Sequence, residues 1–384
     1  MSLDIIIVVI VFVIIFSISW YFIHGKNSSK KKRSQSLDKK IKQLSSAKLQ
    51  GMTGSIQEQE YLIPKESDVV KIPDEFLNFK LLRFDDLNDK QQQEIDEMSH
   101  CTRQPNPLLL TLTQSEIEPK ELMDLIKSDA EMTAKIINTV NSSLFALRQP
   151  IESIQHAIVF MGVAAVKSIA IQFILQQSIS FQDKAQAAAY KKIWISSYLA
   201  SSFVFLLAKH LDKENAAELS TLCLLVCLGD MTMFSYKPSM ANLYLNHTSL
   251  YERVRDEQLS LGTNAAVIGK VLAERWQLPK SIVEGIGNSL NPLVNNTLNR
   301  DQPIEEFQNT LLCYFSCRLG DLVAFEGVRD IFQVGDDGVE TLNGLDFYYV
   351  QTSVEQAGLE KISQLFRDQS FISKAKKLIA QIAV

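Results

Sequence analysis

The chain has 384 residues, of which 46% are hydrophobic and 22% charged, enough for one large or two ordinary folded domains with a substantial core. Its net charge of −5 excludes a global positive field that would attract nucleic acid. The five cysteines are odd in number and lack the spacing of a secreted disulfide framework, which indicates reduced thiols in the cytoplasm.

The first hydrophobic run, residues 5–23, contains no charged residue and consists mostly of Ile, Val and Phe. At about 1.5 Å per residue, a helix of this length covers the roughly 30 Å hydrocarbon core of a bilayer. A cleaved signal peptide is the alternative, but no basic segment precedes the run and no small-residue cleavage site follows it. The sequence therefore predicts an uncleaved transmembrane helix at 5–23.

Basic residues are concentrated on one side of this run. Asp4 is the only charged side chain before it, whereas eight basic residues follow: Lys26, Lys30, Lys31, Lys32, Arg33, Lys39, Lys40 and Lys42. The positive-inside rule then predicts a single-pass protein of the bacterial inner membrane, with its N-terminus outside and the remaining chain in the cytoplasm. The basic run is either a topology signal alone or also a contact for anionic headgroups, worth about 1 kcal/mol per residue. Residues 24–72 are polar and form the predicted linker.

Helical patterns follow in sequence. Pro119 is suited to begin a helix that includes 121–127, and Ser128 with Glu131 forms a capping-box pattern for the next one. Pro150 breaks the pattern, and a further helix is expected to end at Gly162 before another begins at once. Later helices are predicted over 182–210, 215–229, from Thr263 to about 276, from Pro279 onward, and over 307–325, 354–366 and 371–382. Since no run shows strand alternation, the fold class is predicted to be all-α.

The stretch SDAEMTAKIINTVNSSLF (128–145), followed by PIESIQHAIVFMG (150–162), resembles the opening of the HDOD domain, the HD-related output domain of bacterial signalling proteins. The resemblance implies a helical HD-like domain over 98–295, with a C-terminal helical extension over 296–384 packed on it. Residues that match the family signature are Asp129, Asn141, Ser142, Gly162, Gly229, Trp276 and Pro279.

The positions of the HD metal ligands hold other residues. HD-type phosphohydrolases use His and Asp ligands to bind metals that activate water. Where the family reads His-Asp, this chain has Val226 and Cys227; the family's Gly-x-His is represented by Gly262, Thr263 and Asn264, and its later His pair by Asn288 and Ser289. None of the five histidines is followed by Asp, and Asp321, a candidate for the family's late Asp, cannot alone bind a metal pair. No metal, cofactor or catalytic residue is therefore predicted.

Two further groups of residues have both a functional and a structural interpretation. Cys223 with Cys227, and Cys313 with Cys317, are each four residues apart on apolar helices, so they form either a zinc site or two pairs of small core residues, the interpretation we favour. Four acidic residues are expected to form a solvated face: Asp230, Glu252, Asp256 and Glu257. No Gly-rich phosphate loop, Ser/His/Asp arrangement or nucleotide fingerprint occurs.

The resulting hypothesis is a non-catalytic, membrane-tethered signalling module that binds protein partners of a signalling pathway and no nucleic acid. Binding is expected on a helical surface or in a vestigial cleft formed by Val226, Cys227, Thr263, Asn264, Asn288 and Ser289, whose amides and hydroxyls could also hold a small ligand. The alternatives are a degenerate HD-type metal-dependent phosphohydrolase acting on nucleotides or cyclic dinucleotides, and a membrane-tethered scaffold without a ligand.

Overall fold

The computed structural model describes residues 72–382, apart from 115–116, 143–146, 148, 179–180, 182, 248, 295–302, 333, 336–337, 340–341 and 343. The predicted transmembrane helix at 5–23 and all but the last residue of the predicted linker lie outside the described residues, so both stay predictions. Within the described part, one helical run, Ala216–Tyr236, is long and apolar enough to span a membrane, but 78% of its apolar window is buried inside the protein. This run is therefore accounted for as a core element.

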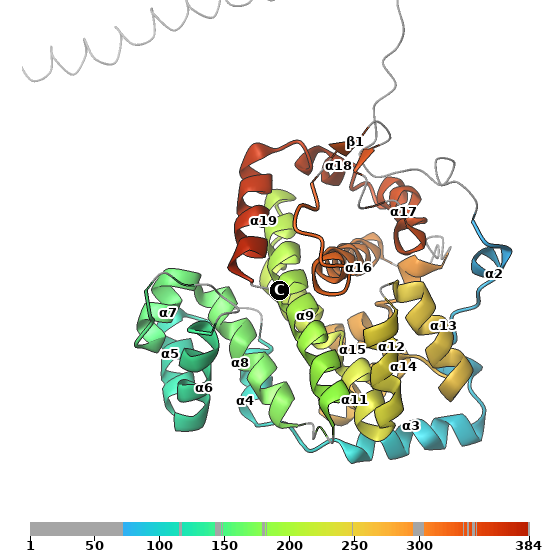
Figure 1. Ribbon diagram of the computed structural model, residues 1–384, viewed down its shortest axis with the longest axis horizontal. Coiled ribbons are helices and arrows are strands. Elements are labelled where there is room, and N and C mark those ends of the chain that lie inside the picture. The colour runs from blue at the N-terminus through green and yellow to red at the C-terminus, as the bar shows by residue number, and fades with distance from the viewer. Residues whose placement is uncertain are drawn as a thin grey trace, which may run out of the picture. The chain divides into compact units, whose positions relative to one another are not determined.

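Between loops and turns, the regular structure of the described residues is helical except for one short β-ladder, in which β1 (Val334–Gly335) pairs antiparallel with β2 (Gly338–Val339). The predicted all-α class is thus confirmed (Figure 1). The helices are α2 (Asp74–Leu77), α3 (Asp89–Cys101), α4 (Leu108–Leu112), α5 (Pro119–Lys127), α6 (Ala130–Val140), α7 (Ile154–Met161), α8 (Val163–Gln177), α9 (Lys184–His210), α10 (Ala216–Leu225), α11 (Leu228–Tyr236), α12 (Ala241–Asn246), α13 (Leu250–Leu261), α14 (Ala265–Arg275), α15 (Lys280–Gly287), α16 (Ile304–Ala324), α17 (Val350–Gln356), α18 (Lys361–Leu365) and α19 (Gln369–Gln381). Short 3-10 turns are η2 (Phe84–Asp86), η3 (Pro238–Met240), η4 (Asn291–Leu293) and η6 (Leu345–Phe347).

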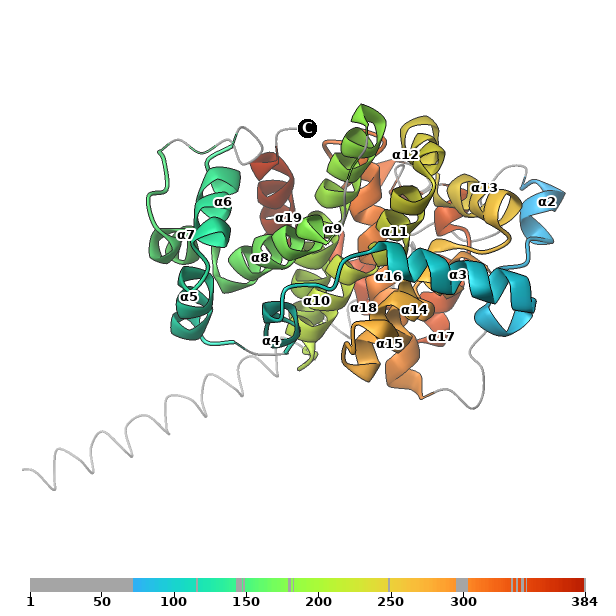
Figure 2. The same ribbon diagram turned by 90° about the horizontal axis from the view of Figure 1, so that it is seen from below.

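Helices α5, α6 and α7 gather at one end of the domain, and α8 joins them to the rest (Figure 2). The N-cap of α6 is Asp129, whose side chain accepts from the amide of Met132 at 2.9 Å. The predicted N-cap, Ser128, is wrong: it closes α5, and its hydroxyl donates to the carbonyl of Leu125. Either residue type can cap a helix, and only the backbone conformation decides between neighbours.

Two signature residues shape the connections on either side of α7. Asn141 bridges the loop, because its Nδ2 donates to the carbonyl of Ile151 and its Oδ1 accepts from the amide of the same residue, both at 2.7 Å. Gly162 ends α7 and begins α8 at a φ of +87°, a conformation that side chains with a Cβ rarely adopt. The break that the sequence predicted at Gly162 is thus confirmed in position and cause.

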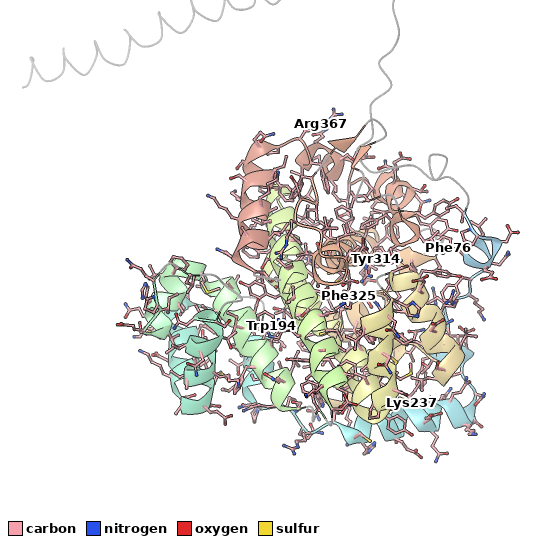
Figure 3. All side chains as sticks on the ribbon, in the orientation of Figure 1. Phe76, Trp194, Lys237, Tyr314, Phe325 and Arg367 are labelled. Carbon is pink, nitrogen blue, oxygen red and sulfur yellow. The ribbon has the colours of Figure 1, made fainter. Side chains whose placement is uncertain are left out.

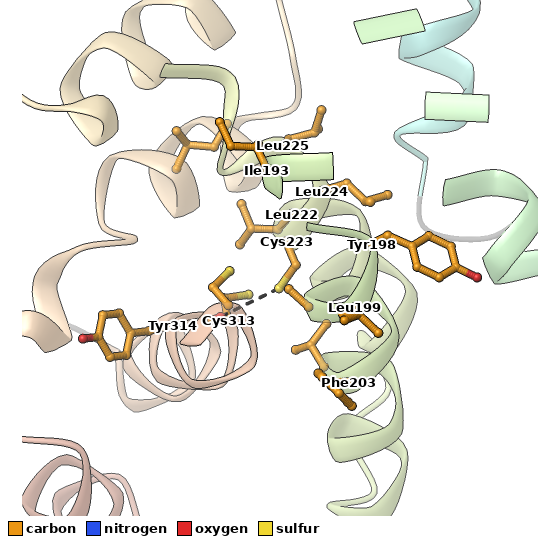
Figure 4. Close-up of a cluster of buried hydrophobic side chains, with 14 of the residues drawn as sticks. Ile193, Tyr198, Leu199, Phe203, Leu222, Cys223, Leu224, Leu225, Cys313 and Tyr314 are labelled. Carbon is orange, nitrogen blue, oxygen red and sulfur yellow. Dashed lines mark hydrogen bonds between the residues drawn. The ribbon is translucent and has the colours of Figure 1, made fainter. Parts of the chain in front are cut away.

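The long helix α9 is the centre of the domain and packs against α8, α10, α12, α16 and α19 (Figure 1). Its core side chains include the fully buried Leu199 and Phe203, which meet Leu222 and Leu225 of α10 and Tyr314 of α16 in one apolar cluster (Figure 4). At its N-terminal end, Asp183 forms a capping box with Gln186.

Helices α11 and α14 approach each other without intervening side chains. A Cβ placed on Gly229 would lie 1.8 Å from the carbonyl oxygen of Ala265 and 2.8 Å from the amide nitrogen of Gly269. Only glycine permits this approach, which explains the place of Gly229 in the signature. The other signature residues of this region, Trp276 and Pro279, cap the end of α14 and the start of α15.

The C-terminal helices pack on the same core. The helix predicted over 354–366 is in fact two, α17 and α18, separated by Gly358 with a φ of +65°. Asp346, from η6, caps the start of α13: its carboxylate accepts from the amides of Leu250 and Tyr251 and from the Ser249 hydroxyl, at 2.7–2.9 Å. The C-terminal region therefore fixes the position of α13, which supplies part of the site described next.

Candidate functional site

A small buried cavity lies between α9, α11, α13, α14 and α16. Its volume of about 60 Å³ leaves room for a few water molecules. Polar and charged side chains from these helices converge on it, an arrangement unlike the apolar cluster of Figure 4 beside it. The polar lining residues are Ser196, Ser197, Cys223, Cys227, Asp230, Tyr244, Arg253, Glu257, Ser289, Cys317, Arg318 and Asp321.

Asp321 of α16 is the centre of the charge network. Its Oδ2 pairs with Nη2 of Arg253 at 2.5 Å and with Nη1 of Arg318 at 2.8 Å, and its Oδ1 accepts from the Ser196 hydroxyl. All four of these side chains are buried. Burial opposes ionisation of Asp321, but the nearby charges of Arg318 and Arg253 and its hydrogen bonds outweigh burial and lower the pKa of Asp321. The network is therefore ionised and fully enclosed.

Aromatic rings flank the two guanidinium groups. Arg253 Cζ lies 4.2 Å from the centroid of the Phe325 ring, and Arg318 Cζ lies 5.3 Å from that of Tyr314 (Figure 3 labels both rings). A cation facing an aromatic ring is attracted by its electrons, more strongly where water is excluded. The rings thus compensate part of the cost of burying two cations beside a single carboxylate.

A second buried group joins Asp230, Tyr244 and Glu257. The Tyr244 hydroxyl donates to Asp230 Oδ1 at 2.7 Å and lies 3.2 Å from Glu257 Oε1, while Glu257 Oε2 accepts from the amide of Ala265. A phenol has one proton, so only one of the two carboxyl groups can accept it. Burial, with the charge of Asp230 next, raises the pKa of Glu257 to about 8, so a protonated Glu257 can donate to the phenol oxygen.

The prediction that Asp230 and Glu257 belong to a solvated face is wrong for these two residues. Glu257 of α13 is buried, and Asp230 of α11 lines the cavity, because each lies on the face of its helix that is turned to the interior. Glu252 and Asp256 do lie nearer the solvent, where their carboxylates are 3.3 Å and 3.0 Å from the two ring nitrogens of His247.

The six residues of the predicted vestigial cleft do not all meet. Val226, Cys227 and Ser289 line the buried cavity. Asn264 and Asn288 line a separate hollow of about 320 Å³ beside residues 81–85. Thr263 lines neither and is buried in the turn between α13 and α14. The single cleft predicted from the sequence is therefore two separate spaces in the structure.

Asn264, treated in the sequence as a vacant ligand position, has a structural role. It is the N-cap of α14, with its Oδ1 accepting from the amide of Val267, and its Nδ2 donates to the carbonyl of Leu82. The N-cap predicted at Thr263 is therefore wrong by one residue.

Sequence reasoning missed both arginines of the network. Arg318 and Asp321 are three residues apart in the apolar run LLCYFSCRLGDLVA, and this i,i+3 spacing of opposite charges was the available signal. Arg253 gave no comparable signal, because it lies in a helix rich in charged residues and meets Asp321 across 68 positions of sequence.

Three of the four helical cysteines, Cys223, Cys313 and Cys317, are buried thiols, and Cys227 is partly exposed. Cys223 Sγ donates to the carbonyl of Cys313 at 3.9 Å, and Cys313 Sγ donates to that of Leu219 at the same distance (Figure 4). Burial, and then hydrogen bonds to Cys313 and Cys317, raises the pKa of Cys223 well above its usual range. A protonated thiol is a poor metal ligand.

The residues present do not fit the metal pair of an HD-type enzyme. Val226 has no donor atom, the pKa of Cys227 is raised by burial, and the only carboxylate among them, Asp321, is occupied by two guanidinium groups. Across the described residues, no group of three or more His, Cys, Asp or Glu side chains is placed to hold a metal ion. Two buried positive charges beside the cavity would also oppose a dication.

The HDOD domain model matches residues 106–292. An HDOD domain protein with unknown function from Geobacter sulfurreducens has a similar structure, with a TM-score of 0.52 and 16% identity over 77% of this chain and 99% of that chain. A protein from Marinobacter aquaeolei, provisionally described as a signal transduction protein, has a TM-score of 0.48 and 17% identity, covering 79% and 62% of the two chains. At these identities the likeness concerns the fold alone.

Two further similarities have the same limit. A protein from Shewanella amazonensis, provisionally described as a phosphohydrolase, has a TM-score of 0.46 and 15% identity over 77% of this chain and 98% of that chain. An uncharacterized protein from Treponema pallidum is 22% identical over 245 residues, which are 57% of this chain and 47% of the relative. The chain thus spans about half the length of that relative.

Proposed function

Because this chain carries an HDOD domain over residues 106–292, we propose that it is a signalling module that binds protein partners and does not itself catalyse a reaction. In this proposal the helix at 5–23 holds the protein in the bacterial inner membrane, and the domain lies in the cytoplasm. The partners are proteins of a signalling pathway.

The observation that carries the proposal is the pairing of Asp321 with two arginines. An HD-type hydrolase needs carboxylate and imidazole ligands that are free to bind metals and so activate water. Here Arg253 and Arg318 supply fixed positive charge beside Asp321. Releasing Asp321 for a metal would leave two buried cations unpaired, which costs several kcal/mol (about 3–5).

The dimensions of the cavity also favour protein partners over a nucleotide substrate. Sites for drug-sized ligands typically enclose about 300–1,000 Å³. The charged cavity, at about 60 Å³, is far below this range. The separate hollow beside residues 81–85 reaches about 320 Å³, so this size limit applies to the charged cavity alone. In this proposal partners are recognised by the outer helical surfaces, and the interior charge network holds those helices in place.

The rival function, metal-dependent hydrolysis of nucleotides or cyclic dinucleotides, is tested directly on the full-length protein in detergent micelles. After equilibration with Mn²⁺, Fe²⁺ or Zn²⁺ and removal of free metal, we expect substoichiometric bound metal and no product from cyclic dinucleotides. Stoichiometric metal together with turnover that Asp321→Ala abolishes would overturn the proposal. Lys376→Ala, which changes a surface ion pair with Asp330, is the matched control.

The partner itself is sought by affinity capture of the tagged full-length protein from native membranes. We expect stoichiometric enrichment of a defined signalling protein that survives washing at high salt. A capture containing no protein above the level of an untagged control would favour the ligand-free scaffold instead.

A further inference from the structure

The segment that enters the domain, residues 73–87, runs along the outside of α13 and α14 and is held by an aromatic anchor. The Phe76 ring is buried between three tyrosines: it packs edge-on against Tyr251 at 5.0 Å and Tyr348 at 5.6 Å, and stacks on Tyr349 at 5.7 Å between centroids. Figure 3 shows Phe76 at the edge of the domain. The anchor joins the start of the described chain to α13 and to the C-terminal region.

Beyond the anchor, side-chain amides bind the backbone of the same segment. Gln258 Oε1 accepts from the amide of Leu82 at 2.9 Å, and Gln258 Nε2 donates to the carbonyl of Lys80 at 3.0 Å. Asn264 Nδ2 donates to the carbonyl of Leu82 at 2.8 Å. These bonds recognise an extended backbone and not particular side chains, and they add to the apolar contacts of the buried Phe76, Leu81 and Leu87.

The residues that bind the segment are immediate neighbours of residues that form the charged cavity. Gln258 follows Glu257, which lines the cavity and contacts Tyr244. Asn264 precedes Ala265, whose amide donates to Glu257. The turn between α13 and α14 is thus held from outside by the segment and from inside by Glu257.

We propose that residues 73–87 are a releasable strap: when docked they keep the α13–α14 turn closed over the charged cavity, and their release opens it. The strap directly follows the predicted linker, so a force or partner acting on the linker reaches the strap first. It would convey a change near the membrane to the interior of the domain. This inference goes beyond the proposed function, since it concerns how the domain is switched and holds with or without catalysis.

Two native cysteines make the opening measurable. Cys223 lines the cavity and is fully buried, and burial raises the pKa of its thiol, so its alkylation requires the cavity to open. Cys101, on α3, is exposed and reports on the reagent itself. Alkylation of each residue can be followed by mass spectrometry in the full-length protein.

Phe76→Ala removes the aromatic anchor. Gln258→Ala removes the side-chain hydrogen bonds to the backbone of the strap. A loss of one or two kcal/mol in the docking of the strap corresponds to roughly a 5- to 30-fold change in an opening equilibrium, and we expect a rise of at least this size in the alkylation rate of Cys223. Cys101 should react at an unchanged rate in every variant. Phe84→Ala is the matched control, because this phenylalanine lies in the strap but its ring is 39% exposed; it should behave as the wild type.

Hydrogen–deuterium exchange at 80–82 shows whether the strap has been released. Faster exchange there, with an unchanged alkylation rate at Cys223, would overturn the proposal. If Phe76→Ala unfolds the domain, the buried Cys313 will also react, and Gln258→Ala then decides, since it leaves the apolar core intact. Equal acceleration by Phe84→Ala would likewise refute the anchor's role.

Discussion

Replacing Asp321 by Asn tests the charge network most directly. The substitution keeps the side-chain size but removes the charge that pairs with Arg253 and Arg318, and it places an amide N–H₂ where only acceptors fit. Removing one partner of a buried ion pair costs about 3–5 kcal/mol. We expect a loss in this range, a large part of the 5–15 kcal/mol or so that stabilises a typical domain.

Thermal unfolding of the full-length protein in detergent, followed by tryptophan fluorescence, measures this loss. At roughly 2–4 °C per kcal/mol, Asp321→Asn should lower Tm by roughly 6–20 °C at neutral pH. The control Lys376→Ala breaks a pair in which both side chains are 48% exposed, and its cost should stay within about 1 kcal/mol.

The pH dependence of the unfolding free energy tests the same prediction a second time. The folded pKa of Asp321 is below its unfolded value of 3.8, so its stabilising contribution is complete above that value and is lost as pH falls through the folded pKa. The difference between wild type and Asp321→Asn should therefore shrink in strong acid. A variant within 1 kcal/mol or so of the wild type at pH 7 would refute the reasoning, because it would mean that the guanidinium groups are not compensated by Asp321.

Three further expectations concern stability, each measured by the same unfolding assay. Gly229→Ala should cost at least about 1–3 kcal/mol, because the added Cβ would collide with the backbone of α14. Gly344→Ala, with no atom within 4 Å of its added Cβ, should be tolerated. Equal effects of the two substitutions would contradict the close approach of α11 and α14. Glu257 has a folded pKa of about 8 against 4.5 unfolded, so the folded state retains its proton between these values, and the free energy of unfolding should fall as pH rises from 5 to 8, by at most about 1.4 kcal/mol per pH unit. Glu257→Gln should abolish this pH dependence. An unchanged slope in the variant would mean that another group causes it. Asn141→Ala should cost about 1–3 kcal/mol, because it leaves the backbone N–H and C=O of Ile151 unpaired. Asn78→Ala, on the exposed surface, should change stability by less than about 0.5 kcal/mol. Comparable losses in the two variants would show that Asn141 does not bridge the loop.

The helices were largely predictable because their determinants are local. Apolar spacing located α9, Pro119 began α5, and Gly162 ended α7, each within a few residues of its place in the structure. Errors at helix starts ranged from one residue, at Thr263, to four, since the helices predicted from 307 and 354 begin at Ile304 and Val350. Adjacent residues of either type can cap, and the backbone angles that decide between them are not written in the sequence.

The charged cavity was not predictable from local pattern. Glu257 lies in a helix that reads as solvated, and its burial follows from the packing of α13 against residues about 65 positions later in the chain. The resemblance pointed to the right region, since Val226, Cys227 and Ser289 do border the cavity, but it could not supply Arg253. Side chains that pair only in the tertiary structure leave no periodic signal.

The contact between Gly229 and Gly269 has a mechanical consequence. Side chains between helices can change rotamer and absorb a small displacement, whereas two backbones in direct contact have no such compliance. A shift of α14 must therefore move α11 with it, including the start of α11 beside Cys227. Helices α11 and α14 are therefore expected to move as one rigid pair, coupled at the first turn of α14.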